Sequence, residues 1–467
     1  MFLYNSLKSK ELDQLTIKNG ISGFLLMMRA SKKLWTIAEK NLNGKVYSIC
    51  GSGNNAGDAY GVASLALMDR KEVKCISLSD VSGDAFLAKQ FYLNLGGKIL
   101  KKLPKNSSVK KGDIIIDGIF GSGLARRPQG KFANAINWIN NSKKMGAKIL
   151  SVDLPSGINA SNGIAFNEVV KADFTMMCLS KKQGCYTGDA PNFTGKLFFD
   201  DLGCKNYKIK PSSYLIKKKS LDFPKHNPTS YKGSKGKLLV LGGWDNMEGA
   251  GCLAGLAGLK TGAGKVYSCG PSFKSRPLEL IGIEKNIDKF RNVIDKVDAI
   301  VAGPGLGNNA NTFLQLSWES NKPLVLDADG LIWLANERPK KRKVEFIGTP
   351  HFGEAKILLK QFQKDRFKLI HDLFDLYGGK WVLKGAGTIT GPNPIFVNPY
   401  SDQILGTAGS GDVLAGIIGG FLSQKTNNAS NLGVWVHSKC AKEVAKKKGK
   451  TLVASDLIDV IGNVIKK

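Results

Sequence analysis

Short apolar runs, each followed by a glycine-rich turn, recur along this sequence and restrict the folds that it can adopt. In the first half they lie at 46–50, 73–78, 114–116 and 149–152, and in the second half at 238–241, 299–302, 324–326 and 381–383. Continuously apolar runs of this length are typical of parallel strands that are covered on both faces. Helix-length segments separate them, among them 61–68, 249–260 and 413–422. The pattern predicts an α/β fold with two doubly wound parallel sheets.

The length of the chain also favours two domains. With 467 residues the chain is longer than an ordinary single domain, and each half is long enough to bury its own core. A segment rich in lysine and proline, 208–224, separates the two patterned halves. We place the boundary near Leu221, with domains at 1–215 and 221–467.

The chain is strongly basic, with 68 Lys and Arg against 38 Asp and Glu and a net charge of +30. Its basic residues are scattered in short groups such as 217–219 and 446–448, without interleaved aromatics, zinc-finger spacing or one long basic arm. We therefore expect no nucleic acid and no membrane as partners. A solvated lysine-rich surface explains the charge, and weak attraction of anionic small molecules is the alternative.

The cysteines and the N-terminal segment indicate in which cellular compartment the protein is expected. The eight cysteines include no CxxC pair and no cluster with histidine, so we expect reduced thiols. The apolar stretch 21–28 is too short to span a membrane and follows a charged segment, unlike a signal peptide. These features predict a cytoplasmic protein.

Three polar clusters follow strands of the first half. The first is the glycine-rich stretch 51–58, which precedes a helix and resembles a phosphate cradle. The second contains Asp117 and continues through 120–127, and the third is 153–157. The carboxyl ends of parallel strands meet at one edge of a sheet, which predicts one ligand crevice. Taken singly, Asp117 and Asp153 are also suited to capping a helix or forming a turn.

The motifs GSGNNAGDAYG, DGIFGSG and VDLPSGINASNG, in this order, resemble the NAD(P)H-hydrate epimerase domain over residues 1–215. The resemblance implies a Rossmann-like fold, a potassium ion held by Asn55, Asp117 and Ser156, and catalysis by Asp153 at the nicotinamide C6 centre. It also implies that the hydrated dinucleotide is bound by Asn54, Asn55, Ala56, Gly57, Asp58, Gly121, Ser122, Gly123, Leu124, Ala125, Arg126, Arg127 and Asp153.

This sequence departs from that family pattern at three positions. Ala56 stands where the family has glycine, and Met28 and Arg29 stand where it has an acid and an amide. These changes leave open an alternative in which the N-terminal domain is only a binding or scaffolding module.

Polar clusters follow strands in the second half as well, at 303–307, 327–329, 349–354 and 384–388, and a fifth, 407–412, opens a helix. A glycine-rich turn at a helix N-terminus offers N–H groups to a transferring phosphoryl group, and Asp412 beside it can take a proton from a hydroxyl. The alternative for Asp412 is an ordinary acid in the first turn of a helix. The chain has no GxxxxGK[ST] loop, and His351 has no neighbouring Cys or His, so neither a P-loop nor a zinc site is predicted.

The ordered motifs HNPTSYKGSKGKLLVLGG, GAGCLAGLAGLKTGAGKVYS, AGPGLG, DADG, TPHFGEA, LKGAGT and TAGSGDVLAGIIGGFLSQ resemble the ADP-dependent NAD(P)H-hydrate dehydratase domain, itself ribokinase-like, from Leu221 to the end. The resemblance implies that Asp412 is the base that activates the C6 hydroxyl for phosphorylation, with Mg²⁺ neutralising the nucleotide phosphates. Phosphate then leaves and the ring double bond is restored. The hydrate would contact Ala263, Gly305, Gly307, His351 and Asp412, and the nucleotide would contact Lys384, Gly385, Ala386, Gly387, Thr388 and Gly411.

Together the two resemblances predict a metabolite-repair enzyme, an isomerase joined to a lyase. Its expected partners are the hydrates of NADH and NADPH, with ADP as co-substrate and a homo-oligomeric assembly. One alternative keeps only the C-terminal dehydratase active, with the N-terminal domain as a scaffold. Another makes the C-terminal domain a kinase for a small alcohol or vitamin, which the complete TPHFGE and LKGAGT set argues against.

Overall fold

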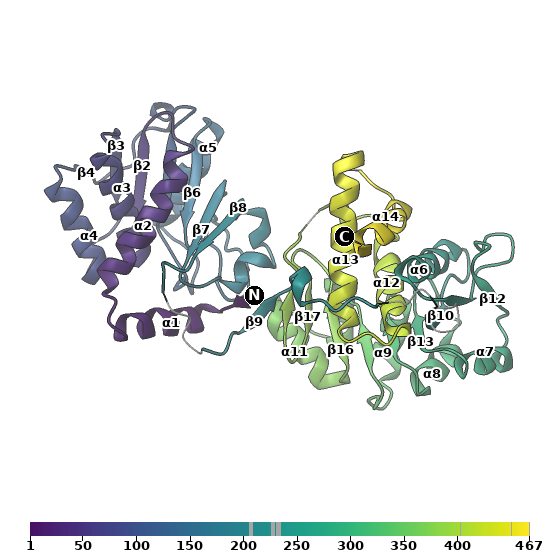
Figure 1. Ribbon diagram of the computed structural model, residues 1–467. Helices are drawn as coiled ribbons and strands as arrows, with labels where there is room; N and C mark the ends of the chain where they lie inside the picture. Colours follow the sequence, from purple (N-terminus) through teal and green to yellow (C-terminus); the bar gives the residue numbers. More distant parts are fainter. Residues whose placement is uncertain (205–208, 226–228, 230–234, 402, 450, 467) are drawn as a thin grey trace. The chain divides into compact units, whose positions relative to one another are not determined.

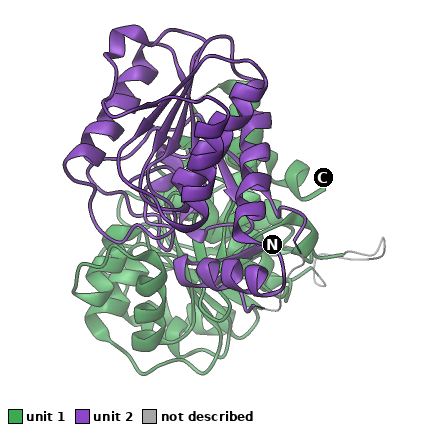
Figure 2. Cartoon of the chain, turned by 90° about the vertical axis from the view of Figure 1, so that its left-hand side faces the viewer, with its two compact units in different colours: residues 1, 215–467 green, residues 2–214 purple. Residues whose placement is uncertain are grey.

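The computed structural model describes residues 1–204, 209–225, 229, 235–401, 403–449 and 451–466. The chain forms two compact units, one of residues 2–214 and one of residue 1 with 215–467 (Figure 2). Most of the HNPTSYKGSKG segment, which begins at residue 226, lies outside the described residues. Among those described, no helix is long and apolar enough to cross a membrane.

The first unit is built on a parallel sheet in which the strands run in the order β4–β3–β2–β5–β6–β7–β8 (Figure 1). Because the chain winds outward from β2 on one side and from β5 on the other, the gap between these two carboxyl ends is the switch point where ligands bind in such sheets. The strands are β2 (Val46–Cys50), β3 (Val73–Ser77), β4 (Ile99–Leu100), β5 (Ile114–Gly118), β6 (Lys148–Val152), β7 (Phe174–Cys178) and β8 (Lys196–Asp200). The short β1 (Phe2–Leu3) pairs antiparallel with β9 (Ser213–Leu215).

Helices cover both faces of this sheet, which explains why its strands are continuously apolar. Ile114 and Ile116 of β5 join the core under α2, α3 and α4, whereas Ile115 joins the core under α5. The helices of this unit are α1 (Ser6–Lys18), α2 (Gly23–Glu39), α3 (Asn54–Met68), α4 (Gly83–Asn94) and α5 (Lys131–Lys144).

Helix α3 begins earlier than the sequence predicts. We expected a helix at 61–68 after a loop, but α3 starts at Asn54, so residues 54–58 form its first turns. Close packing is the reason, because a Cβ on Gly57 would lie 2.3 Å from the Met27 sulfur and 2.8 Å from the Ala85 Cα. The glycine that suggested a loop therefore allows a helix to approach its neighbours. Asp117, expected just beyond a strand, lies within β5.

The second unit has a larger sheet in which β12–β11–β10–β13–β14–β15–β16–β17–β18 are neighbours in this order. Pairing is parallel as far as β16 and antiparallel from β16 to β18. The strands are β10 (Lys237–Leu241), β11 (Lys265–Cys269), β12 (Ile281–Ile283), β13 (Ala299–Ala302), β14 (Leu324–Leu326), β15 (Phe346–Gly348), β16 (Lys380–Leu383), β17 (Ile389–Gly391) and β18 (Phe396–Val397).

Helices α6, α12 and α13 lie on one face of this sheet, where α13 contacts β16, and α14 packs against α13 and α6. Helices α8, α9 and α11 lie on the opposite face (Figure 1). Gly416 allows α12 to approach α6, because a Cβ there would lie 2.2 Å from the Ala254 carbonyl oxygen. The helices are α6 (Glu248–Thr261), α7 (Ile287–Ile294), α8 (Asn311–Glu319), α9 (Asp329–Glu337), α10 (Phe352–Leu359), α11 (Arg366–Tyr377), α12 (Ser410–Ser423), α13 (Ala429–Lys448) and α14 (Ala454–Lys466).

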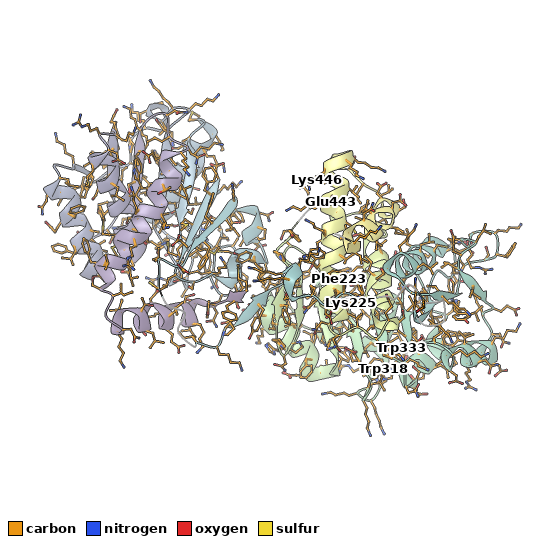
Figure 3. All side chains as sticks on the ribbon, in the orientation of Figure 1. Phe223, Lys225, Trp318, Trp333, Glu443 and Lys446 are labelled. Carbon is orange, nitrogen blue, oxygen red and sulfur yellow. The ribbon has the colours of Figure 1, made fainter. Side chains whose placement is uncertain are left out.

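Aromatic side chains pack against helices on both faces of this unit, and Phe223, Trp318 and Trp333 are labelled in Figure 3. Phe223, near the predicted domain boundary, packs edge-to-face on Trp435 of α13, with ring centroids 5.9 Å apart. Trp318 and Trp333 of α8 and α9 make a similar contact at 6.0 Å on the opposite face. The residues around Leu221 thus pack with the core of the second unit.

Candidate active sites

In the first unit, Asn55 joins three strand ends. It lies in the first turn of α3, which follows β2, and its Nδ2 donates to the carbonyls of Val152 at 2.7 Å and Phe120 at 3.3 Å. These carbonyls belong to the end of β6 and to the loop after β5. Gly121 must be a glycine here, since a Cβ would lie 2.2 Å from the Asn55 Oδ1. The structure therefore brings the three predicted clusters together at one edge.

Asp117 is the buried centre of this edge. Its Oδ2 accepts hydrogen bonds from the Ser151 hydroxyl at 2.8 Å and the Ser156 amide at 2.9 Å, and its Oδ1 accepts one from the Ser156 hydroxyl at 2.6 Å. Burial raises the pKa of Asp117, and the Ser156 hydrogen bonds oppose that rise. The oxygens of Asn55, Asp117 and Ser156 are hard donors of the kind that bind alkali and alkaline-earth cations.

Asp153 lies beside this centre in a strained conformation. Its φ of +67° is in the left-handed region, which is rare for a residue other than glycine and concentrates at functional sites. Its Oδ1 contacts the ammonium of Lys182, which also donates to the Cys178 carbonyl at 3.0 Å. Lys182 is 4% exposed. Burial alone would lower the pKa of Lys182, but Asp153 and Asp13 raise it overall, so the pair is a buried ion pair.

Two further carboxylates surround this pair. Burial raises the pKa of Asp58, on α3, well above its ordinary value, and the Asp153 charge adds to the rise. Desolvation and the Asp153 charge also raise the pKa of Asp13, on α1, to about 6, although this residue is partly open to solvent. Helix α1 is fixed here by a 3.1 Å hydrogen bond from the Ser180 hydroxyl to Ser9, one turn before Asp13.

Neither Asp13 nor Lys182 was predicted from the sequence. The available signal was positional, because Lys182 follows the apolar strand 174–178 just as the predicted clusters follow theirs. That strand was not among the predicted ones.

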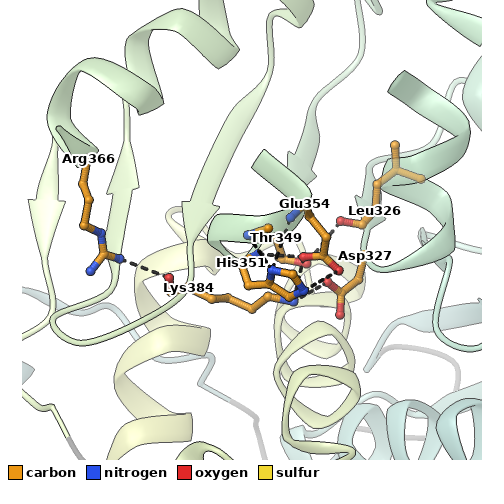
Figure 4. Close-up of polar contacts among 8 residues, drawn as sticks. Leu326, Asp327, Thr349, His351, Glu354, Arg366 and Lys384 are labelled. Atoms are coloured by element: carbon orange, nitrogen blue, oxygen red, sulfur yellow. Dashed lines mark hydrogen bonds and ion pairs between the residues drawn. The ribbon is translucent and has the colours of Figure 1, made fainter. Parts of the chain in front are cut away.

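In the second unit, Lys384 lies between two carboxylates at the ends of β14, β15 and β16 (Figure 4). Its Nζ is 2.7 Å from the Asp327 Oδ1 and 3.6 Å from the Glu354 Oε2. Burial alone would lower the pKa of Lys384, but Asp327 and Glu354 raise it overall, so its positive charge is retained.

Asp412 lies in the first turn of α12, next to this group. A Cβ built on the preceding Gly411 would lie 3.4 Å from the Lys384 Nζ and 3.5 Å from the Asp327 Oδ2. Burial and then the Asp327 charge raise the pKa of Asp412 to about 7, and Lys384 limits the rise. A carboxylate that titrates near neutral pH is suited to general-base catalysis.

His351 caps the N-terminus of α10. Its Nδ1 accepts hydrogen bonds from the amides of Gly353 at 2.9 Å and Glu354 at 3.2 Å, while its own amide donates to the Glu354 Oε2 at 2.6 Å. Since Nδ1 is an acceptor, a neutral ring carries its proton on Nε2. The side chain is 60% exposed, so this N–H is available to a ligand.

Two side chains hold the loops at the carboxyl edge of the second sheet. The sequence predicted a role for neither of them. The Asp329 Oδ2 accepts from the amides of Leu306 at 2.8 Å and Gly307 at 2.9 Å, which fixes the GPGLG loop. Arg366, which is buried, donates to the carbonyls of Ala386 at 2.6 Å and Leu383 at 2.7 Å. It also donates to the Lys384 carbonyl at 3.2 Å (Figure 4), and these bonds fix the KGAGT loop.

Each half of the chain matches a known protein family. Residues 24–184 match the family described as YjeF-related protein N-terminus, and residues 238–463 match the NAD(P)H-hydrate dehydratase family. The bifunctional NAD(P)H-hydrate repair enzyme Nnr of Coxiella burnetii is 33% identical, and the alignment covers 97% of each chain. The enzyme of the same name from Escherichia coli is also 33% identical, with 96% of this chain and 90% of the relative covered.

The chain belongs to the family of bifunctional NAD(P)H-hydrate repair enzymes. Both predicted resemblances are confirmed, and so is the predicted α/β fold class with its two doubly wound domains. A solved ribokinase-like superfamily protein from Enterococcus faecalis aligns with a TM-score of 0.51 at 22% identity, covering 56% of this chain and 98% of that one. That likeness shows the ribokinase-like fold.

One residue that the resemblance predicted to contact the hydrate, Ala263, does not lie at the carboxyl edge of the second sheet. Ala263 follows α6 and precedes β11, at the amino-terminal edge of the parallel sheet, whereas Gly305, His351 and Asp412 follow strand ends at the carboxyl edge. The correction follows from topology, since α6 carries the chain back across the sheet. Ala250, at the start of α6, lies at the correct edge, because a Cβ on Gly305 would come within 3.0 Å of its Cβ.

The predicted epimerase residues differ in what they can offer a ligand. Ala56 and Gly57 are buried in the packing of α3, so only their backbone could reach a bound molecule. Residues 121–127 are exposed or half-buried. Arg127 makes a bidentate contact with Glu168 at 2.7 and 2.9 Å, which neutralises part of its charge.

Proposed function

We propose that the first unit interconverts the R and S forms of the NADH and NADPH hydrates and that the second dehydrates the S form with ADP. The chain is an NAD(P)H-hydrate repair enzyme, an isomerase and a lyase in one polypeptide. We assign the epimerase to 1–215 and the dehydratase to 221–467. The supporting observation is that each sheet ends in an acid beside a lysine: Asp153 and Lys182 form a buried ion pair, and Asp412 lies near the half-buried Lys384.

Dehydration begins at Asp412 in this proposal. Asp412 removes the proton of the C6 hydroxyl while the hydroxyl oxygen attacks the terminal phosphorus of ADP, and AMP leaves with the electron pair of the broken P–O bond. Phosphate then departs from C6 with its bonding pair, and loss of the C5 proton restores the ring double bond. The Nε2–H of His351 and the GPGLG backbone orient the hydrate, with Ala250 in the place given to Ala263 by the sequence.

The nucleotide would lie along Lys384, Gly385, Ala386, Gly387 and Thr388, with Gly411 leaving room for its phosphates. Arg366 holds the carbonyls of Ala386 and Leu383 and thereby fixes the backbone of this loop, where the nucleotide would lie. Mg²⁺ would supply charge neutralisation for the phosphates, and the carboxylates near Lys384 are hard oxygen donors of the type it accepts.

In the epimerase unit, Asp153 would act on the C6 hydroxyl proton. Lys182 would supply a positive charge opposite the Asp153 carboxylate, and Asp13 and Asp58 lie close enough for their charges to interact with this pair. Potassium would be held by Asn55, Asp117 and Ser156, and it would attract the anionic part of the dinucleotide toward residues 54–58 and 121–127. The buried ion pair of Asp153 and Lys182 supports an active epimerase domain rather than a scaffolding module. A cytoplasmic homo-oligomer is the expected form.

The direct test supplies the purified chain with verified S hydrate, Mg²⁺ and either ADP or ATP. We expect the dihydronicotinamide absorbance to return, with AMP and phosphate released when ADP is used. If no nucleotide supports turnover, the dehydratase assignment is wrong. A parallel reaction that starts from the R hydrate tests the epimerase, since R is consumed faster than it epimerises spontaneously only if that unit is active.

A further inference from the structure

A buried histidine contacts the first turn of α12 from behind. His437 lies on α13, is 7% exposed, and its Nε2 is 3.1 Å from the hydroxyl of Ser410, which is 4% exposed. Ser410 lies two residues before Asp412.

The turn that His437 contacts has little rigidity of its own. It contains Gly409, whose φ is +81°, and Gly411, and glycine restricts the backbone less than any other residue. Ser410 is the one residue between them, so its side chain is the natural point at which a neighbouring helix can hold the turn. The amides of this turn have no partners within the helix, and they and Asp412 must keep their directions to bind a phosphoryl group.

His437 is neutral at physiological pH. Burial lowers the pKa of its imidazole to about 4, and the positive charge of Lys384 adds to that effect. A neutral ring has one N–H donor and one acceptor nitrogen, so Nε2 can either donate to the Ser410 hydroxyl or accept from it.

We propose that His437 is a positioning residue of the dehydratase, which holds Ser410 and through it the orientation of Asp412 and of the anion-binding amides. This inference rests on the proposed role of Asp412 and adds a residue from α13 to that site. His437 itself touches neither substrate in this proposal.

The test is a double-mutant cycle on the full chain, with Ser410→Ala, His437→Leu and the two combined. A displacement of about 1 Å in a catalytic group costs up to roughly a hundredfold in rate, so we expect each single change to lower the kcat of dehydration about tenfold to a hundredfold. The KM for the hydrate should change little. Because both changes break one contact, the double variant should be no slower than the slower single variant.

Two results of this cycle would overturn the inference. One is a wild-type kcat in Ser410→Ala, and the other is a double variant whose loss in kcat equals the product of the two single losses. His437→Asn, which keeps a donor and an acceptor, should recover part of the rate that His437→Leu loses, and equal losses would contradict the contact. His371→Leu, at an exposed position on α11, is the matched control. The melting temperature of each variant, compared with that of His371→Leu, reports whether the second unit is folded.

Hydrogen–deuterium exchange gives a readout that does not depend on turnover. Amides of 409–413 should exchange faster in Ser410→Ala and in His437→Leu than in the wild-type protein, and unchanged exchange would refute the inference. A wild-type chain without dehydratase activity would instead refute the proposed function, while the exchange data would still decide whether His437 holds the turn.

Discussion

Replacing Asp412 with asparagine should make the second unit more stable and nearly inactive at the same time. The buried carboxylate has a pKa of about 7, against 3.8 for an unperturbed aspartate. The folded protein therefore binds this proton more tightly than the unfolded chain. The resulting stability is fully present below pH 3.8 and is lost as the pH rises through 7. Asparagine has the shape of the protonated acid and does not incur this loss.

The size of the effect on stability follows from the shift in the pKa of Asp412. From 3.8 to about 7 is roughly 3 units, and at about 1.4 kcal/mol per unit the ionised carboxylate costs the folded state about 4 kcal/mol at pH 8. At pH 5 the cost is about 1.5 kcal/mol, because only the unfolded chain has lost the proton there. In a unit of this size about 4 kcal/mol raises the melting temperature by roughly 8–16 °C.

The assay compares melting curves of the wild-type and Asp412→Asn proteins at pH 5 and pH 8, together with dehydration rates. We expect a gain in melting temperature that grows with pH, and a loss of turnover of about a hundredfold to ten-thousandfold, since asparagine cannot accept the proton. The wild-type rate should rise through about pH 7 as Asp412 ionises.

Asp456 is the matched control. It also lies in the first turn of a helix, α14, but a hydrogen bond from Lys448 lowers its pKa, so Asp456→Asn should bring no gain at pH 8. An Asp412→Asn protein no more stable than wild type at pH 8 would refute the burial argument. Turnover near the wild-type rate would make Asp412 a helix-capping residue.

Three other changes test the remaining parts of the two sites. Lys182→Met should slow epimerisation about a hundredfold or more and leave dehydration of the S hydrate intact, whereas Lys181→Met, beside it in the sequence, should preserve both rates. Asp153→Ala should let only about half of an equal R and S mixture react quickly, and complete rapid consumption would exclude Asp153 from the epimerase. Arg366→Gln should raise the KM for ADP about tenfold or more, because it removes charged hydrogen bonds that hold the KGAGT loop; an unchanged KM would show that the loop is held by other contacts.

Much of the framework was predictable from local sequence. The runs 46–50, 299–302 and 324–326 are the strands β2, β13 and β14 with the predicted limits. Strands covered on both faces leave a continuous apolar signal, and parallel sheets bring their carboxyl ends together, so Asn55, Asp117 and Ser156 could be expected at one edge. The motif order was enough to identify the family.

The errors and omissions involve contacts between segments that are distant along the chain. Nothing local to Gly57 shows that Met27 and Ala85 lie against it, so its glycine was interpreted as part of a loop. Ala263 was assigned from a motif, but the direction of α6 across the sheet places it at the opposite edge.

The sequence by itself determined many of the strands, the two doubly wound domains and the family, because these depend on patterns within a few residues of one another. The tertiary structure alone decided that Lys182 lies against Asp153, that Arg366 holds the carbonyls of a loop some twenty residues away, and that His437 of one helix contacts Ser410 of another. The energy of a buried charge or hydrogen bond depends on the burial and partner that packing supplies, and the residue type alone does not specify either.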